Sequence, residues 1–338
     1  MKYRPVGIFL GSTGLAGGLV VYLCARAGLD PAAAAGLFSR LEPESFVEVV
    51  ILLGINSFLA GERWRLTDRR LAGDDYHMMP RTAYFAWTAL GVGFGQILPT
   101  QVSLALCRSA ALRLHHGRGL LRGAAETVFE QSFDILVAGF VGVGSILAIA
   151  TGGEAITWIG SVLAAFGIGI VLCMVGCRVL ERLTRLMIVR ADIGPTNRVG
   201  NVLAALNQSG LLSPAITLRL LALSVARFVV LALLAAISAQ AISLNCPLWQ
   251  LAATQPFAVF GNALAITPGG LGINEWATAS ALFAFGVPFQ LAAQWAVVNR
   301  ALVAFAALCG ATIGVLILVM PRWSSSLMPG ERRRWKSI

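Results

Sequence analysis

The sequence of residues 255–300 reads QPFAVFGNALAITPGGLGINEWATASALFAFGVPFQLAAQWAVVNR, and the predicted fold follows from it. Its two apolar runs, residues 257–266 and 277–285, are each about ten residues long, whereas a helix that crosses a membrane needs about 20 residues. The intervening TPGGLG segment, which contains Pro268, Gly269, Gly270 and Gly272, cannot continue a helix. We therefore predict a re-entrant hairpin of two half-helices, because irregular backbone at membrane depth must be covered by protein or trapped water.

The composition predicts an all-α polytopic membrane protein with a single membrane domain, residues 1–338. The chain is 57% hydrophobic and only 12% charged, with a mean hydropathy of +0.77. Its formal net charge is +10, but the basic residues lie between apolar runs. Membrane topology and anionic lipid headgroups explain such a distribution better than nucleic acid does. The first apolar run, residues 6–24, is too long for a signal peptide and is predicted to stay as a helix.

Eight hydrophobic segments are predicted, six full transmembrane helices and two re-entrant hairpins. The full helices are expected at residues 6–24, 45–59, 124–150, 155–177, 214–241 and 291–320. A first hairpin spans residues 83–114 with its tip at Leu98-Pro99-Thr100, and arginine-rich flanks place both its ends in the cytoplasm. The hairpin at residues 255–285 follows the uncharged link 242–253 and is expected to enter from outside.

The order of these segments predicts an inverted-topology repeat. Residues 1–150 form helix, helix, hairpin and helix from the inside, and residues 155–320 form the same series from the outside. Secondary transporters built in this way hold their substrate near the bilayer midplane. Residues 321–338 form a basic tail. By the positive-inside rule this tail and the N-terminus are cytoplasmic, in the inner membrane of a bacterium.

Charged residues inside the apolar segments mark the candidate site. Arg108 precedes Glu130 by 22 residues, and Glu275 precedes Arg300 by 25. The two hairpins thus carry opposite charges, and so do the helices that follow them. A charge at membrane depth costs about 2.5–3.5 kcal/mol on insertion scales, so these groups should not face lipid. Glu275 and Arg300 either lock a hairpin only or also serve substrate, and Arg108 could also snorkel to the surface.

One predicted helix carries Glu126, Glu130 and Asp134 on a single face. The first two could be partly interfacial, whereas Asp134 needs a partner, most simply Arg108 or Arg227. A deep arginine such as Arg227 can hold a phosphate through paired hydrogen bonds. The half-helices that begin after Pro99 and Gly270 add positive dipole ends. Together these features favour an anionic headgroup.

Sequence patterns of enzymes and metal sites are not convincing. The glycines at 269–272 lack the GK[ST] ending of a phosphate-binding loop. The six cysteines form no CxxC motif and are expected to pack in the membrane core. His115-His116 is expected to be a solvated loop pair. We therefore predict no enzyme, no cofactor and no metal.

The segment PGGLGINEW and the later Arg300 resemble the C-terminal signature of the lysylphosphatidylglycerol synthase transmembrane-region family. This family includes the flippase domain of the multiple peptide resistance factor. Its pattern, P-PGG-G-EA and a distant arginine, is similar here at Pro268, Gly269, Gly270, Gly272, Glu275 and Arg300. Arg63-Trp64, Leu98-Pro99 with Arg108, and Glu130 with Asp134 also fit. Thr267 and Gln131 depart from it, because the family often has proline and arginine there.

The resemblance implies a lipid flippase or lipid transporter. We expect it to move an anionic, phospho- or prenyl-phosphate-linked lipid across the inner membrane. The expected substrate-binding residues are Arg300, Glu275, Arg227, Arg108, Glu130 and Asp134. Two alternatives stay open, a non-catalytic membrane partner of a lipid or glycan synthase and a membrane-embedded transferase.

Overall fold

The computed structural model describes residues 4–28, 36, 42–72, 78–117, 120–190, 213–263 and 267–320. Within these ranges the chain forms ten α-helices and one 3₁₀ helix and contains no strand, as the composition predicted. The elements are α1 (Arg4–Arg26), α3 (Pro43–Ala72), α4 (Arg81–Phe94), α5 (Thr100–His116), α6 (Leu120–Ala150), α7 (Ala155–Arg190), α9 (Pro214–Gln240), α10 (Leu248–Ala263), η1 (Pro268–Gly270), α11 (Ile273–Ala284) and α12 (Phe289–Val319). The basic tail at 321–338 lies outside the described residues.

Five of these helices are long and apolar enough to cross a membrane. They include the stretches Pro43–Leu71, Leu121–Ala150, Ala155–Gly176, Pro214–Gln240 and Phe289–Val319. The described part of α1 adds a shorter apolar helix, Thr13–Arg26. The polytopic class is therefore confirmed, whereas five rather than six long spans are found in the described part of the chain.

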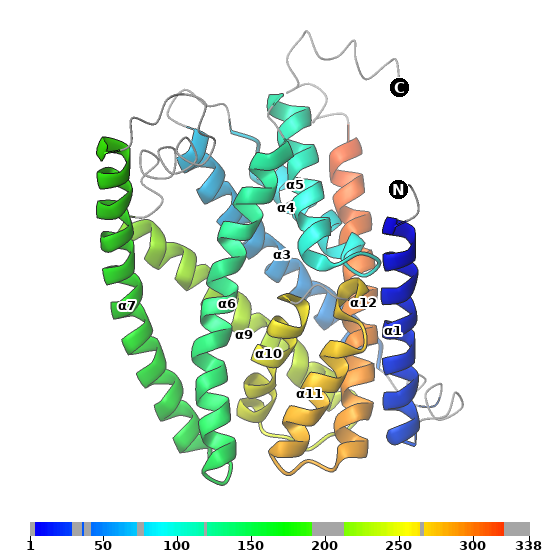
Figure 1. The fold of residues 1–338 in the computed structure, drawn as a ribbon. Coiled ribbons are helices and arrows are strands. Elements are labelled where there is room, and N and C mark those ends of the chain that lie inside the picture. Colours follow the sequence, from blue (N-terminus) through cyan, green and yellow to red (C-terminus); the bar gives the residue numbers. More distant parts are fainter. Residues whose placement is uncertain are drawn as a thin grey trace.

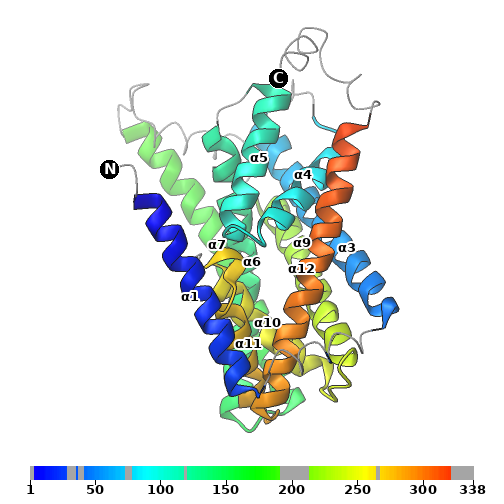
Figure 2. The same cartoon turned by 90° about the vertical axis from the view of Figure 1, so that its right-hand side faces the viewer.

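Two helical hairpins run into the bundle from opposite ends (Figure 1). α4 and α5 form the first, which turns at residues 95–99, and α10, η1 and α11 form the second. The turns lie side by side near the centre of the molecule (Figure 2). There the backbone N–H of Gly269 donates a 3.1 Å hydrogen bond to the carbonyl oxygen of Leu98. The predicted tips at Pro99 and at 268–272 are therefore turns that contact each other.

The second hairpin begins earlier than the sequence suggested. α10 starts at Leu248 and contains Pro256 within it, although the sequence predicted an external link up to residue 253. The link between α9 and α10 is consequently short, residues 241–247. A proline removes only one backbone N–H from a helix. The longer run of helical contacts around Pro256 is enough to keep the helix continuous.

The largest correction concerns α3. The sequence predicted a helix at 45–59 followed by a charged cytoplasmic loop, but the helix continues for 30 residues to Ala72. Its second half buries one face, which includes Ala60, Arg63, Trp64 and Thr67. These positions recur every three to four residues, which is the helical repeat. The charges that suggested a loop belong to a helix that packs inside the bundle.

Small residues let the hairpins pack closely on long helices. A Cβ atom on Gly93 of α4 would lie 2.5 Å from the Cβ atom of Ala311 of α12. On the other side, Trp276 of α11 donates a 2.9 Å hydrogen bond to the carbonyl oxygen of Leu19 in α1. Its ring also stacks on Tyr22, with 5.4 Å between the centroids. The first hairpin is thus fixed to α12 and the second to α1.

Candidate functional site

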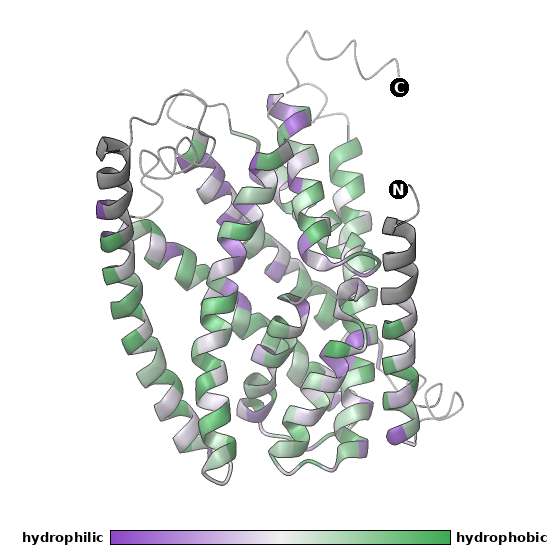
Figure 3. Cartoon of the chain, viewed as in Figure 1, coloured by the Kyte–Doolittle hydropathy of each residue, from purple (hydrophilic) through white to green (hydrophobic). Residues whose placement is uncertain are grey.

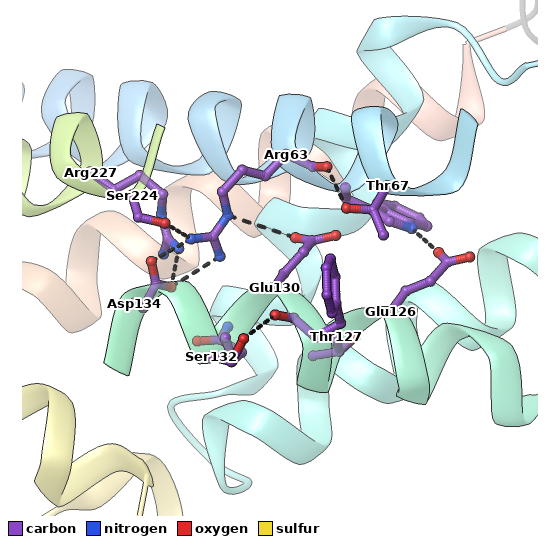
Figure 4. A network of polar contacts seen from close by, with 12 residues as sticks. Arg63, Thr67, Glu126, Thr127, Glu130, Ser132, Asp134, Ser224 and Arg227 are labelled. Carbon is purple, nitrogen blue, oxygen red and sulfur yellow. Dashed lines mark hydrogen bonds and ion pairs between the residues drawn. The ribbon is translucent and has the colours of Figure 1, made fainter. Parts of the chain in front are cut away.

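Five charged side chains from four helices meet in the middle of the bundle (Figure 4). We call them the central charge cluster: Arg63 of α3, Arg108 of α5, Glu130 and Asp134 of α6, and Arg227 of α9. α6 supplies both carboxylates because they are four residues apart and so lie on the same helix face. The cluster has three cations and two anions at their formal charges.

Asp134 is bound by two arginines at once. Its Oδ2 atom accepts a 3.0 Å hydrogen bond from Nη2 of Arg63 and a further one from Nη1 of Arg227. Its Oδ1 atom accepts from Nη1 of Arg63, which also donates to Oγ of Ser224. Arg227 donates through Nε to Oδ1 of Asn56 at 3.1 Å. Both carboxylate oxygens of Asp134 are thus engaged.

Glu130 lies deeper and has 0% of its side chain exposed. It forms ion pairs with Nη1 of Arg108 at 3.0 Å and with Nε of Arg63 at 3.8 Å. The Arg108 guanidinium also lies 5.2 Å from the centre of the Trp64 ring, a favourable cation–π geometry. Arg108 is 1% exposed. It therefore does not snorkel, and Glu130 is not interfacial.

The polar network continues along α3 and α6 beyond the central charge cluster. Glu126 is buried and accepts hydrogen bonds of 2.8 Å from Trp64 Nε1 and from Arg122 Nε. Arg122 also donates to Oδ1 of Asp68 at 3.1 Å, and Tyr84 donates to Oδ2 of Asp68 at 2.6 Å. Hydrophilic stretches accordingly interrupt the apolar surface of α6 (Figure 3). Glu126, expected to be partly interfacial, is instead a core residue.

A second charged pair lies at the tip of the other hairpin. Glu275 of α11 pairs with Nε of Arg300 of α12 at 3.6 Å through Oε1. Its Oε2 atom accepts a hydrogen bond from the backbone N–H of Gly272, which caps the first turn of α11. The neighbouring Asn274 donates to Oδ1 of Asn262 at 2.9 Å. Glu275 thus fixes the hairpin tip and faces Arg300.

Two adjoining cavities separate the central charge cluster from this pair. The first has a volume of about 180 Å³, and its lining includes Asp134 and Arg227. The second has a volume of about 130 Å³, and its lining includes Glu275. Arg300 and Asn262 line both, so Arg300 stands between them. Among the described residues, the one charged partner of the Arg300 guanidinium is Glu275.

The six residues expected to bind substrate fall into two groups. Arg108, Glu130, Asp134 and Arg227 meet in the central charge cluster, whereas Glu275 and Arg300 form the separate pair. Arg63 was missed as a member, although it contacts both carboxylates of the cluster. The helical repeat of Asn56, Ala60, Arg63 and Thr67 was the signal that could have found it.

The described residues contain no group of three or more histidine, cysteine, aspartate or glutamate side chains able to hold a metal ion. His115 and His116, expected in a loop, form the last turn of α5. Their ring centroids lie 6.2 Å apart.

Comparison with known proteins places the chain in a family. The family model described as lysylphosphatidylglycerol synthase TM region matches residues 8–319. No curated protein and no solved structure gave a significant match. Since the family model covers almost the whole chain, the protein belongs to this family and is a multi-pass membrane protein.

Proposed function

We propose that this membrane protein is a lipid flippase, which moves a lipid with an anionic headgroup across the bacterial inner membrane. The observation that carries the proposal is the position of Arg300. Its side chain borders both cavities beside the point where Gly269 is hydrogen bonded to Leu98. An arginine at this depth is costly unless it faces a cavity or a partner. We infer that it receives the headgroup.

The proposed topology has two re-entrant hairpins and two inverted halves, residues 1–150 and 155–320. The opposite directions of the hairpins support it (Figure 1). The ion pairs support it as well, since Arg108 of the first hairpin pairs with Glu130 of α6, and Glu275 of the second pairs with Arg300 of α12. In each half a hairpin is thus tied to the long helix that follows. We propose that both termini are cytoplasmic.

The charge balance supports an anionic substrate. Arg63, Arg108, Arg227 and Arg300 face three carboxylates, Glu130, Asp134 and Glu275, through the ion pairs described above. One formal positive charge is left over. A headgroup with one negative charge would neutralise the site, while its hydrocarbon chains stay in the bilayer. In the proposed cycle the protein catalyses no covalent step.

Lipid movement in reconstituted vesicles tests the proposal. Vesicles with a fluorescent anionic phospholipid in both leaflets are treated with a membrane-impermeant quencher, and the protected fraction is measured. Active protein should lower it below the value for protein-free vesicles. Arg300→Gln should abolish this effect, whereas Arg65→Gln should preserve it, because Arg65 pairs with Glu62 at 26% exposure and lines neither cavity.

The alternatives predict other results. A membrane partner of a lipid or glycan synthase would move no lipid by itself, and Arg300→Gln would then matter only when the synthase is present. A transferase would change the mass of its substrate when the purified protein acts alone. Unchanged lipid movement in Arg300→Gln would contradict the assigned site.

A further inference from the structure

We infer that the headgroup is a phosphodiester with uncharged hydroxyl-bearing groups, as in phosphatidylglycerol, and that headgroups with an ammonium group are disfavoured. This inference rests on the proposed function and specifies its substrate. It follows from three properties of the two cavities: their net charge, the occupied state of their carboxylates, and the neutral side chains of their walls.

The carboxylates that line the cavities have no free oxygen for an ammonium group. Both oxygens of Asp134 are held by Arg63 and Arg227. Glu275 is held by Arg300 on one oxygen and by the backbone N–H of Gly272 on the other. An ammonium group that entered would have to displace one of these partners. It would also meet an arrangement that already has an excess positive charge, and like charges brought together cost several kcal/mol.

The remaining polar side chains of the walls are neutral amides and hydroxyls. In the first cavity they are Asn56, Gln96, Thr100, Gln101, Gln131, Ser224 and Asn262. In the second they are Gln255, Asn262, Asn274, Thr278 and Asn299. An amide offers two donors and an acceptor, which suits hydroxyl groups that both donate and accept.

Some of these amides have acceptor atoms without a partner. Asn274 is only 8% exposed, and within the described chain neither its Oδ1 atom nor Oε1 of Gln96 has a hydrogen-bond partner. A buried acceptor without a donor costs free energy. A hydroxyl group of the substrate would supply the donor. Arg300, whose described charged partner is Glu275 through Nε, has its terminal nitrogens for the phosphate.

Headgroup selectivity tests the inference. The full-length protein is reconstituted with one acyl-labelled lipid at a time: phosphatidylglycerol, phosphatidylethanolamine or lysyl-phosphatidylglycerol. Phosphatidylglycerol should move about tenfold faster or more than either ammonium lipid, because a charge mismatch of ~1.4 kcal/mol is already tenfold. If lysyl-phosphatidylglycerol moves as fast, the inference is wrong and the proposed function stands.

A binding measurement separates this result from a failure of transport. The purified protein in detergent is heated with each of the same three lipids, and the shift of its melting temperature is recorded. A larger shift with phosphatidylglycerol supports the headgroup assignment even if the vesicles show no lipid movement, which would overturn only the flippase proposal. Equal shifts with all three lipids overturn the headgroup assignment.

A new carboxylate in the cavity should change the selectivity. Gln131 of α6 lines the first cavity, and Gln131→Glu removes the excess positive charge and provides an acceptor for ammonium. We expect the ratio of phosphatidylglycerol to lysyl-phosphatidylglycerol movement to fall about tenfold. Gln290→Glu is the matched control, since Gln290 is exposed at the start of α12 and lines neither cavity. An unchanged ratio in Gln131→Glu would contradict the role of cavity charge.

Discussion

The backbone N–H of Gly269 donates a 3.1 Å hydrogen bond to the carbonyl oxygen of Leu98, and this bond joins the turns of two hairpins that come from opposite ends of the bundle. Each turn leaves backbone polar groups without helical partners, and such groups need other partners in an apolar environment. The two turns satisfy part of this need together. The bond lies beside Arg300, so the same contact that closes the bundle also shapes the candidate site.

Gly269→Ala should destabilise the contact between the hairpins. Gly269 has a φ of +56°, and an added Cβ would lie 2.6 Å from the carbonyl oxygen of Gly95 and 2.5 Å from Nη2 of Arg300. Gly286→Ala is the control, because its φ is +89° but nothing lies within 4 Å. The control should lose about 1–3 kcal/mol from backbone strain. Gly269→Ala should lose more, as measured by thermal unfolding in detergent, and equal losses would contradict crowding at the tips.

Arg63→Ala should be among the most destabilising single substitutions in the chain. It leaves Glu130 and Asp134 with fewer cations in a buried place, and removal of one partner from a buried pair costs about 3–5 kcal/mol. Arg65→Ala, two residues away, removes a pair with Glu62 that is partly exposed. Such a pair contributes about 0–1 kcal/mol. Similar melting temperatures for the two variants would show that Arg63 is not a central contact.

Glu275→Gln and Glu275→Ala should separate the cap from the charge. The Oε2 atom of Glu275 accepts from the N–H of Gly272, and a glutamine oxygen can do the same. Loss of a helix cap costs about 0.5–2 kcal/mol. Glu275→Ala should therefore melt at a lower temperature than Glu275→Gln, although both should lose lipid movement because Arg300 loses its partner. For the same reason an exchange of Glu275 and Arg300 is uninformative, since an arginine cannot accept the Gly272 hydrogen bond.

Cysteine labelling should place the two ends of the bundle on opposite sides of the membrane. Asn245 in the link before α10 and Arg113 at the end of α5 are both exposed. In sealed vesicles a membrane-impermeant maleimide should label Asn245→Cys from outside and Arg113→Cys only from the cytoplasmic side. Labelling of both from one side would contradict the opposed hairpins.

The native Cys246 sets the background of this experiment and its pH dependence. Burial raises the pKa of its thiol to about 11, and the thiolate is the reactive form. Near neutral pH the thiol is therefore almost fully protonated, so wild-type protein should label slowly. The rate at Cys246 should rise as the pH approaches 11. Rapid labelling of wild-type protein at pH 7 would contradict this environment.

The helices and the breaks between them could be predicted from the sequence because they depend on local properties. Apolar length predicts a span, and Pro268 with its glycines predicts the turn that separates α10 from α11. Charges such as Glu275 and Arg300 could be paired for a related reason, since they lie on consecutive helices joined by a short turn. Family membership could likewise be inferred from the residues around Gly269.

The tertiary structure alone decided which distant residues meet. Arg63 contacts Asp134 across 71 positions of the chain, and Arg227 contacts Asn56 across 171. Arg63 lies in a run of charges that resembles a solvated loop, and only the packing of α3 against α6 and α9 turns this run into a buried helix face. Hydropathy is a property of a segment, whereas burial depends on which other segments cover it. The sequence thus determined the half-helices, and the packing between them determined the cavities and the charge cluster.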